Sequence, residues 1–207
     1  MVSLQGFMNT SLLDRAKDEK LVTLYGVSWE KFKGIEALLE DNRDVRLSYL
    51  SGILEIMSPV GSRHERVKRT LGLLLETYME VLGIRYYATG GFTLEEPGYA
   101  SGTPDESYCI STDKETPDIV IEVIITSGSI DRKELYKPRR VPEVWFWKSD
   151  TIRIFRLNVA LEYEEVNRSS FFPNLDPFLL LQYIAMPDQY DAVQEFEQFL
   201  REVSLLP

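Results

Sequence analysis

The chain has 207 residues, which is enough for one domain with a sizeable core. Its hydrophobic content of 44% and charged content of 27% exclude wholesale disorder. A net charge of −10 argues against general affinity for nucleic acid, and a single cysteine, Cys109, excludes an internal disulfide framework or a multi-cysteine zinc site. Apolar runs are too short to cross a membrane, and the first residues lack the order of a signal peptide. We therefore expect a cytoplasmic protein that has no membrane partner.

The N-terminal part of the chain changes character near residue 25. Residues 1–25 are polar and aperiodic and are expected to form an arm, whereas residues 26–207 are expected to form a single domain. Ser28 is a suitable cap for a helix that follows it. Residues 45–57 alternate between apolar and polar around a Ser-Gly pair, which predicts a β-hairpin.

A long amphipathic helix is predicted to begin at Ser62. Ser62 and Glu65 have the S-x-x-E form of a capping box, and an apolar stripe runs from there to Gly83, which ends the helix. Residues 84–96 then read as one strand interrupted by two glycines.

The remaining elements give the order of the core. From residue 62 to residue 148 the order is helix, three strands, helix and strand, which predicts an α-β-β-β-α-β core in an α+β, or mixed α/β, domain. The N-terminal helix and hairpin precede this core, and two helices follow it. The later predicted elements are strands at 104–110 and 119–125, a short helix at 129–137, a hairpin of 143–148 with 151–157 that 161–166 extends, and helices at 175–185 and 188–203.

Two acidic residues occupy one face of the apolar strand at 119–125. Asp118 and Glu122 are about 13 Å apart along a strand, so both cannot hold one metal ion. If this strand forms a hairpin with the preceding strand, symmetric pairing places Asp105 opposite Glu122 and Cys109 opposite Asp118. Opposed residues have Cβ atoms about 4.5–5.5 Å apart.

Two carboxylates at that spacing share either a proton or a cation, so Asp105 and Glu122 form a candidate Mg²⁺ or Mn²⁺ site. The alternative is that Glu122 lies at a wet edge of the sheet, paired with a base such as Lys133. Asp118 is better explained as a partner of turn amides, with a support role in the site as the lesser alternative. Arg132 and Lys133 in the next helix offer cations for a reacting phosphate, unless they form a solvated helix face.

The only histidine, His64, lies on the apolar side of its predicted helix. Cys109 falls in a strand with no reason to meet it, which argues against a cysteine–histidine or serine–histidine mechanism. We interpret His64 as a packing or hydrogen-bonding residue that can also reach a phosphate. Glu65 is a candidate third metal ligand, ranked below Asp105 and Glu122 because a capping box explains it more simply.

Four stretches together point to a known family: GILEIMSPVGSRHERV, GTPDESYCI, PDIVIEVIITSGSIDRKELY and VPEVWFW. With the PD dipeptide at 104–105 and the acid at 122, the chain resembles the PD-(D/E)xK nuclease superfamily. More specifically it resembles a restriction-endonuclease family expanded in cyanobacteria, over roughly residues 25–185. The resemblance implies a restriction-endonuclease-like mixed β-sheet flanked by helices.

The resemblance also implies roles for individual acids. Asp105 takes the place of the PD aspartate, and Glu122 takes the D/E position. The carbonyl of Val123 is implied as a further metal ligand, and Glu65 matches a first-helix acid that many members use as an extra ligand.

The chain departs from the family pattern at the lysine. Ile124 stands two residues after Glu122, where the superfamily has its lysine. In the family the basic residue lies in the next helix, four residues before a tyrosine that is Tyr136 here, which places Arg132 at the expected position and Lys133 beside it. Arginine keeps the charge but cannot release a proton.

The implied activity is Mg²⁺-dependent hydrolysis of phosphodiester bonds in DNA, with the basic patch from Arg132 to Lys148 holding the backbone. Cleavage of both strands by one site per chain implies a homodimer. Two alternatives remain open: a nuclease fold that binds DNA or protein without cutting, which Ile124 and the net charge favour, and a protein-interaction domain with no nucleic-acid role.

Overall fold

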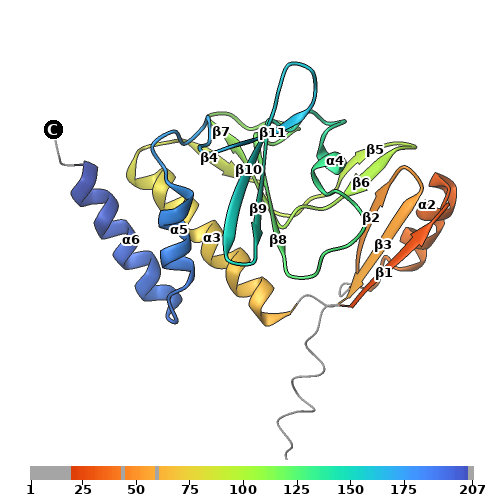
Figure 1. Ribbon diagram of the computed structural model, residues 1–207, viewed down its shortest axis with the longest axis horizontal. Coiled ribbons are helices and arrows are strands. Elements are labelled where there is room, and N and C mark those ends of the chain that lie inside the picture. The colour runs from red at the N-terminus through yellow and green to blue at the C-terminus, as the bar shows by residue number, and fades with distance from the viewer. Residues whose placement is uncertain (1–19, 43–44, 59–60, 205–207) are drawn as a thin grey trace, which may run out of the picture.

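Two β-sheets and five helices make up the described part of the chain, residues 20–42, 45–58 and 61–204 of a computed structural model (Figure 1). The smaller sheet lies on the right of Figure 1, the larger sheet is central, and the long helices lie on the left and below. None of the helices in these ranges is long and apolar enough to cross a membrane.

The smaller sheet has five strands, and all of its neighbouring strands are antiparallel. The predicted hairpin is confirmed: its Ser51-Gly52 turn has φ of 44° and 91°, as a tight hairpin turn requires. Ser28 caps the helix α2 (Trp29–Leu38), because its hydroxyl accepts a hydrogen bond from Lys31 N at 3.3 Å. The strands in spatial order are β1 (Lys20–Tyr25), β3 (Ile53–Ser58), β2 (Arg46–Leu50), β6 (Ala100–Gly102) and β5 (Leu94–Glu96).

The larger sheet has six strands, and only its central pair, β8 with β9, is parallel. The single helical turn α4 (Lys133–Tyr136) lies in the connection between these two strands. The strands in spatial order are β11 (Tyr163–Val166), β10 (Thr151–Leu157), β9 (Glu143–Lys148), β8 (Ile119–Ile124), β7 (Glu106–Ile110) and β4 (Tyr86–Ala88).

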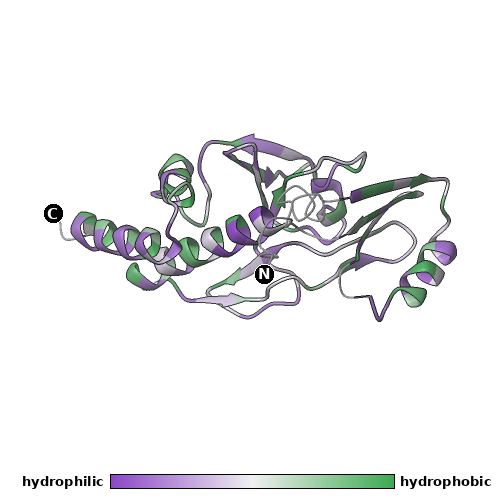
Figure 2. Ribbon diagram, turned by 90° about the horizontal axis from the view of Figure 1, so that it is seen from below, coloured by the Kyte–Doolittle hydropathy of each residue, from purple (hydrophilic) through white to green (hydrophobic). Residues whose placement is uncertain are grey.

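Three helices cover one face of the larger sheet: α3 (Ser62–Val81), α5 (Pro177–Ile184) and α6 (Gln189–Ser204). The long helices at the left of Figure 2 alternate hydrophobic and hydrophilic residues, as expected of helices that bury one side. This core includes the odd-numbered side chains of β8, such as Ile121, whereas Val120 on the other face packs into a second cluster with α4 and β6. The other face of β8, which also carries Glu122, is therefore turned toward α4 and the smaller sheet.

The predicted α-β-β-β-α-β order is confirmed within the larger sheet as α3, β4, β7, β8, α4 and β9. The strand predicted at 84–96 is wrong as a single element, because β4 and β5 belong to different sheets and β6 was not predicted. The chain turns between them at Gly90, which has φ of +62°, and at Gly91, where an added Cβ would lie 2.8 Å from the Pro104 carbonyl oxygen. The two glycines thus divide two strands that lie in different sheets.

Three further predictions need correction. Helix α3 has Gly61 as its N-cap without a side-chain hydrogen bond, so Ser62 and Glu65 form no capping box. The helix predicted at 129–137 is reduced to α4. Of the predicted arm at 1–25, the last six residues are β1, paired with β3, while residues 1–19 lie outside the described residues.

Candidate active site

Strands β7 and β8 pair in the predicted register. Glu106 is opposite Ile121, and continuation of that register by one residue places Asp105 opposite Glu122. Both acids are buried, with 5% of Asp105 and 2% of Glu122 exposed. They line one small cavity where β7 begins and β8 ends.

Asp105 is surrounded by hydrogen-bond donors from three elements. Arg46 Nη1 on β2 donates to Oδ1, Val123 N donates to Oδ2 at 2.7 Å, and His64 Nε2 lies 3.2 Å from Oδ2. Burial by itself raises the pKa of Asp105, but the hydrogen bond with His64 and the charge of Arg46 outweigh it and hold the pKa well below its usual range. Asp105 is therefore a carboxylate in spite of its burial.

Glu122 has its own pair of partners on the segment after β8. Arg132 Nη1 lies 3.3 Å from both carboxylate oxygens, and the Tyr136 hydroxyl donates to Oε1. Burial raises the pKa of Glu122 and the charge of Asp105 adds to this, while the charge of Arg132 opposes it. The Glu122 charge in turn raises the pKa of Arg132, which keeps that guanidinium protonated.

The oxygen ligands in this cavity fit one hard divalent cation whose remaining ligands would be water molecules or substrate atoms. The space between the lining side chains is about 10 Å³, room for roughly one water-sized species. Because N–H and C=O of one strand residue point to the same side, the Val123 carbonyl lies on the side of Asp105. Mg²⁺ is commonly held by one or two carboxylates together with waters and substrate phosphates. Asp105, Glu122 and the Val123 carbonyl supply such a set, provided that Arg46 and Arg132 release the carboxylates.

Glu65 does not join this set. Its carboxylate lies 3.3 Å from His64 Nδ1 and 2.7 Å from Lys68 Nζ, and it does not line the cavity. His64 thus lies between Glu65 and Asp105, in the hydrogen-bonding role that the sequence indicated. In the described residues no group of three or more His, Cys, Asp or Glu side chains could hold a metal ion.

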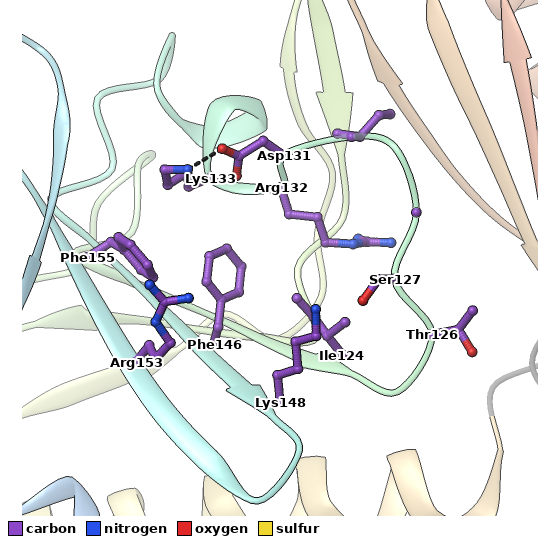
Figure 3. A pocket seen from close by; sticks show the side chains of 12 residues that line it. Ile124, Thr126, Ser127, Asp131, Arg132, Lys133, Phe146, Lys148, Arg153 and Phe155 are labelled. Carbon is purple, nitrogen blue, oxygen red and sulfur yellow. Dashed lines mark hydrogen bonds and ion pairs between the residues drawn. The ribbon is translucent and has the colours of Figure 1, made fainter.

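Two other candidate residues face elsewhere. Lys133 pairs with Asp131 and lies 5.6 Å from the ring centre of Phe155, on the opposite side of α4 from the direction of Arg132 (Figure 3). Asp118 accepts a hydrogen bond from Ile110 N at 2.7 Å and pairs with Lys114, so it holds the β7–β8 hairpin. The basic residue that pairs with Glu122 is therefore Arg132. The alternative, in which Glu122 lies at a wet edge of the sheet and pairs with Lys133, is not found.

The sequence did not single out Arg46 or Glu55, yet both shape the site. Glu55 is only 2% exposed, and its Oε1 accepts from Ser129 N at 2.5 Å and Ile130 N at 2.8 Å. It thereby anchors the loop that leads to Arg132. An acid alternating with apolar residues in ILEIM is the same signal that singled out Glu122 and could have identified Glu55; no local pattern links Arg46 to Asp105, 59 residues away.

The fold and the site together define a class of protein. An α-β-β-β-α-β sheet core that joins an aspartate before one strand, a glutamate within the next strand and a base from the segment that leads into the following helix is a restriction-endonuclease-like nuclease fold. The family model "Uma2: Putative restriction endonuclease" matches residues 29–187, and the chain belongs to this family. A search of curated proteins found no match. The family match begins with α2 and ends before α6, so β1 and α6 lie outside it.

Proposed function

We propose that the protein is a metal-dependent endonuclease that hydrolyses phosphodiester bonds in DNA. The observation that carries this proposal is the pair of buried carboxylates, Asp105 and Glu122, in one cavity with two arginines. Burying charges is costly, and titratable groups with strongly perturbed pKa values in a cavity are candidates for a functional site. Membership of the family supports a nuclease-like function.

Asp105, Glu122 and the Val123 carbonyl would hold the Mg²⁺ or Mn²⁺ ion, which supplies Lewis-acid polarisation of the phosphate and a bound water of lowered pKa. His64 and the Val123 N–H fix the orientation of Asp105, and Tyr136 fixes Glu122. These contacts hold both carboxylates in place before substrate arrives.

The two arginines would act on the substrate. Arg46 and Arg132 balance the charge of the two carboxylates, and with a divalent ion held there in their place the two guanidinium groups would be available to bind the scissile phosphate. Their fixed charge would stabilise the extra negative charge of the transition state. Since arginine does not release a proton and Ile124 replaces the superfamily lysine, this role is electrostatic rather than acid–base.

The partners follow from the same reasoning. DNA would bind weakly, because Lys137 and Arg139 of the basic patch are already paired with Glu162 and Glu115. We propose a homodimer as the unit that cuts both strands. The cytoplasm is the proposed setting, because a chain with a single cysteine needs no oxidising compartment.

A binding module that holds DNA without cutting it is the second candidate. The pairing of both carboxylates with arginines favours it, since such pairs satisfy the buried charge without a cation. The presence of Ile124 in the lysine position favours it as well.

Plasmid cleavage with Mg²⁺ or Mn²⁺ tests the proposal. We expect nicking by the wild-type chain, loss of nicking in Asp105→Asn/Glu122→Gln, and full activity in the control Asp113→Asn/Glu96→Gln, which makes the same charge change at exposed positions. Nicking that persists in the site variant would come from a contaminant and would refute the proposed endonuclease activity. DNA binding without nicking by any form of the protein would support the binding module.

A further inference from the structure

A second cavity opens beside Glu122, between the loop after β8, the start of α4 and the β9–β10 hairpin (Figure 3). Its volume is about 290 Å³, at the lower limit of small-ligand sites. That is the scale of one nucleotide and far too small for a duplex. Arg132 lines both this cavity and the one that holds Glu122, so the two are neighbours.

Strand register fixes the direction from one cavity to the other. Glu122 on β8 pairs with Phe146 on β9, which pairs with Arg153 on β10. Neighbouring strands lie about 4.8 Å apart, so Phe146 stands about one strand from Glu122 and Arg153 about two. A group bound over Phe146 would therefore lie next to the group held at Glu122.

The floor of the cavity is aromatic. Phe146 is partly exposed and packs edge-on against Phe155 with ring centres 5.5 Å apart. Phe155 is itself covered by cations, with Lys133 5.6 Å and Arg153 5.0 Å from its ring centre. Phe146 therefore remains as the ring that rises into the cavity, as Figure 3 shows.

The rim of the cavity carries cations whose charge is largely balanced. Lys133 pairs with Asp131 and Arg153 pairs with Glu165. Lys148 is exposed and forms no ion pair among the residues that the structure describes. Since Arg132 is also paired, with Glu122, three of the four cations that line the cavity have acidic partners, so we expect stacking on an aromatic ring to provide much of the affinity for a nucleotide.

We propose that this cavity binds an unstacked nucleobase of the nucleotide next to the scissile phosphate, so that the substrate is single-stranded or locally unpaired DNA. The inference rests on the proposed nuclease function. Bases within a duplex are stacked on each other and reach a ring such as Phe146 only when they are flipped out. The hydroxyl of Ser127 lies on the cavity side of the loop after β8 (Figure 3) and offers a hydrogen bond to the base edge, while Lys148 offers its charge to the backbone.

Fluorescence anisotropy in EDTA measures binding apart from cleavage. The probe is a labelled single strand of about 12 nucleotides, compared with a blunt duplex of the same sequence. We expect the single strand to bind more tightly and Phe146→Leu to weaken that binding by roughly 5-fold or more, because the replacement keeps an apolar side chain but removes the stacking surface. Phe178→Leu, at an exposed ring on α5, is the matched control and should bind normally.

A second variant covers the case in which Phe146→Leu folds poorly. Lys148→Gln changes an exposed side chain and should lower the slope of log affinity against log salt by about 0.7, the value for one phosphate contact of a single strand. Lys31→Gln on α2 makes the same charge change elsewhere and should leave the slope unchanged.

The outcomes separate this inference from the nuclease proposal. Single-strand binding that needs Phe146, without cleavage in Mg²⁺, would support the nucleobase cavity and count against the enzyme. Two outcomes would overturn the proposal that this cavity binds a nucleobase, even if plasmid cleavage were found. One is an equal affinity for single strand and duplex that neither variant changes, and the other is no single-strand binding at low salt.

Discussion

Replacement of Gly128 by alanine tests how the loop before Arg132 is held. A Cβ at this position would lie 2.1 Å from Glu55 Oε1 and 2.5 Å from its Cδ, far closer than real carbon contacts allow. The Glu55 carboxylate would have to leave the N–H groups of Ser129 and Ile130. A hydrogen bond to a charged acceptor contributes about 1.5–3 kcal/mol, so with partial relaxation we expect a loss of about 2–4 kcal/mol.

Urea unfolding measures this loss. With a slope of about 2 kcal/mol per molar, the midpoint of Gly128→Ala should fall by about 1–2 M. Gly34→Ala is the matched control, since Gly34 lies inside α2 and an added Cβ meets nothing within 4 Å. That control should gain about 0.5–1 kcal/mol from its helix propensity. A urea midpoint for Gly128→Ala within error of the wild type would refute the inference that hydrogen bonds to the Glu55 carboxylate hold this loop.

Other predictions concern the core. Cys109 is 0% exposed and burial raises its thiol pKa, so it should react with a maleimide far more slowly in buffer at pH 8 than in urea; equal rates would contradict its burial. Glu143 is 0% exposed and accepts hydrogen bonds from Trp145 Nε1 and from two serines, so Glu143→Ala should lower the unfolding free energy by about 3–5 kcal/mol in urea titrations. Phe196 on α6 is 0% exposed, so Phe196→Ala should cost about 3–5 kcal/mol by calorimetry although it lies outside the family match, whereas the exposed Phe178→Ala should cost little.

Sequence patterns predicted the elements whose determinants are local. The hairpin of β7 and β8 follows from two apolar runs around a polar tip, and its symmetry gave the register that opposes Asp105 and Glu122. The helices α2 and α3 follow from their apolar stripes. In each case residues close in the chain decide the structure.

What the sequence missed depends on contacts between distant segments. The three residues of β6 carry no periodic pattern, and their pairing with β2 is decided by the smaller sheet as a whole. The direction of the Lys133 side chain is set by its contacts with Phe155 on β10 and with Asp131. Phe155 is distant from Lys133 in the sequence, so a local sequence pattern does not include all three residues. Ser62 is the first residue of α3 and not its cap, because Gly61 before it is the N-cap.

The candidate active site takes its side chains from β2, α3, the residue before β7, β8 and the segment that leads into α4. No short segment of the chain contains all of them, so a divalent ion that uses this site would favour the native state over the unfolded state. At a concentration 100-fold above its dissociation constant, such an ion would add about 2.7 kcal/mol to the stability of the fold. The melting temperature in Mn²⁺ would therefore report ion occupancy directly, with no need for DNA, and Asp105→Asn/Glu122→Gln would lose this dependence on the ion.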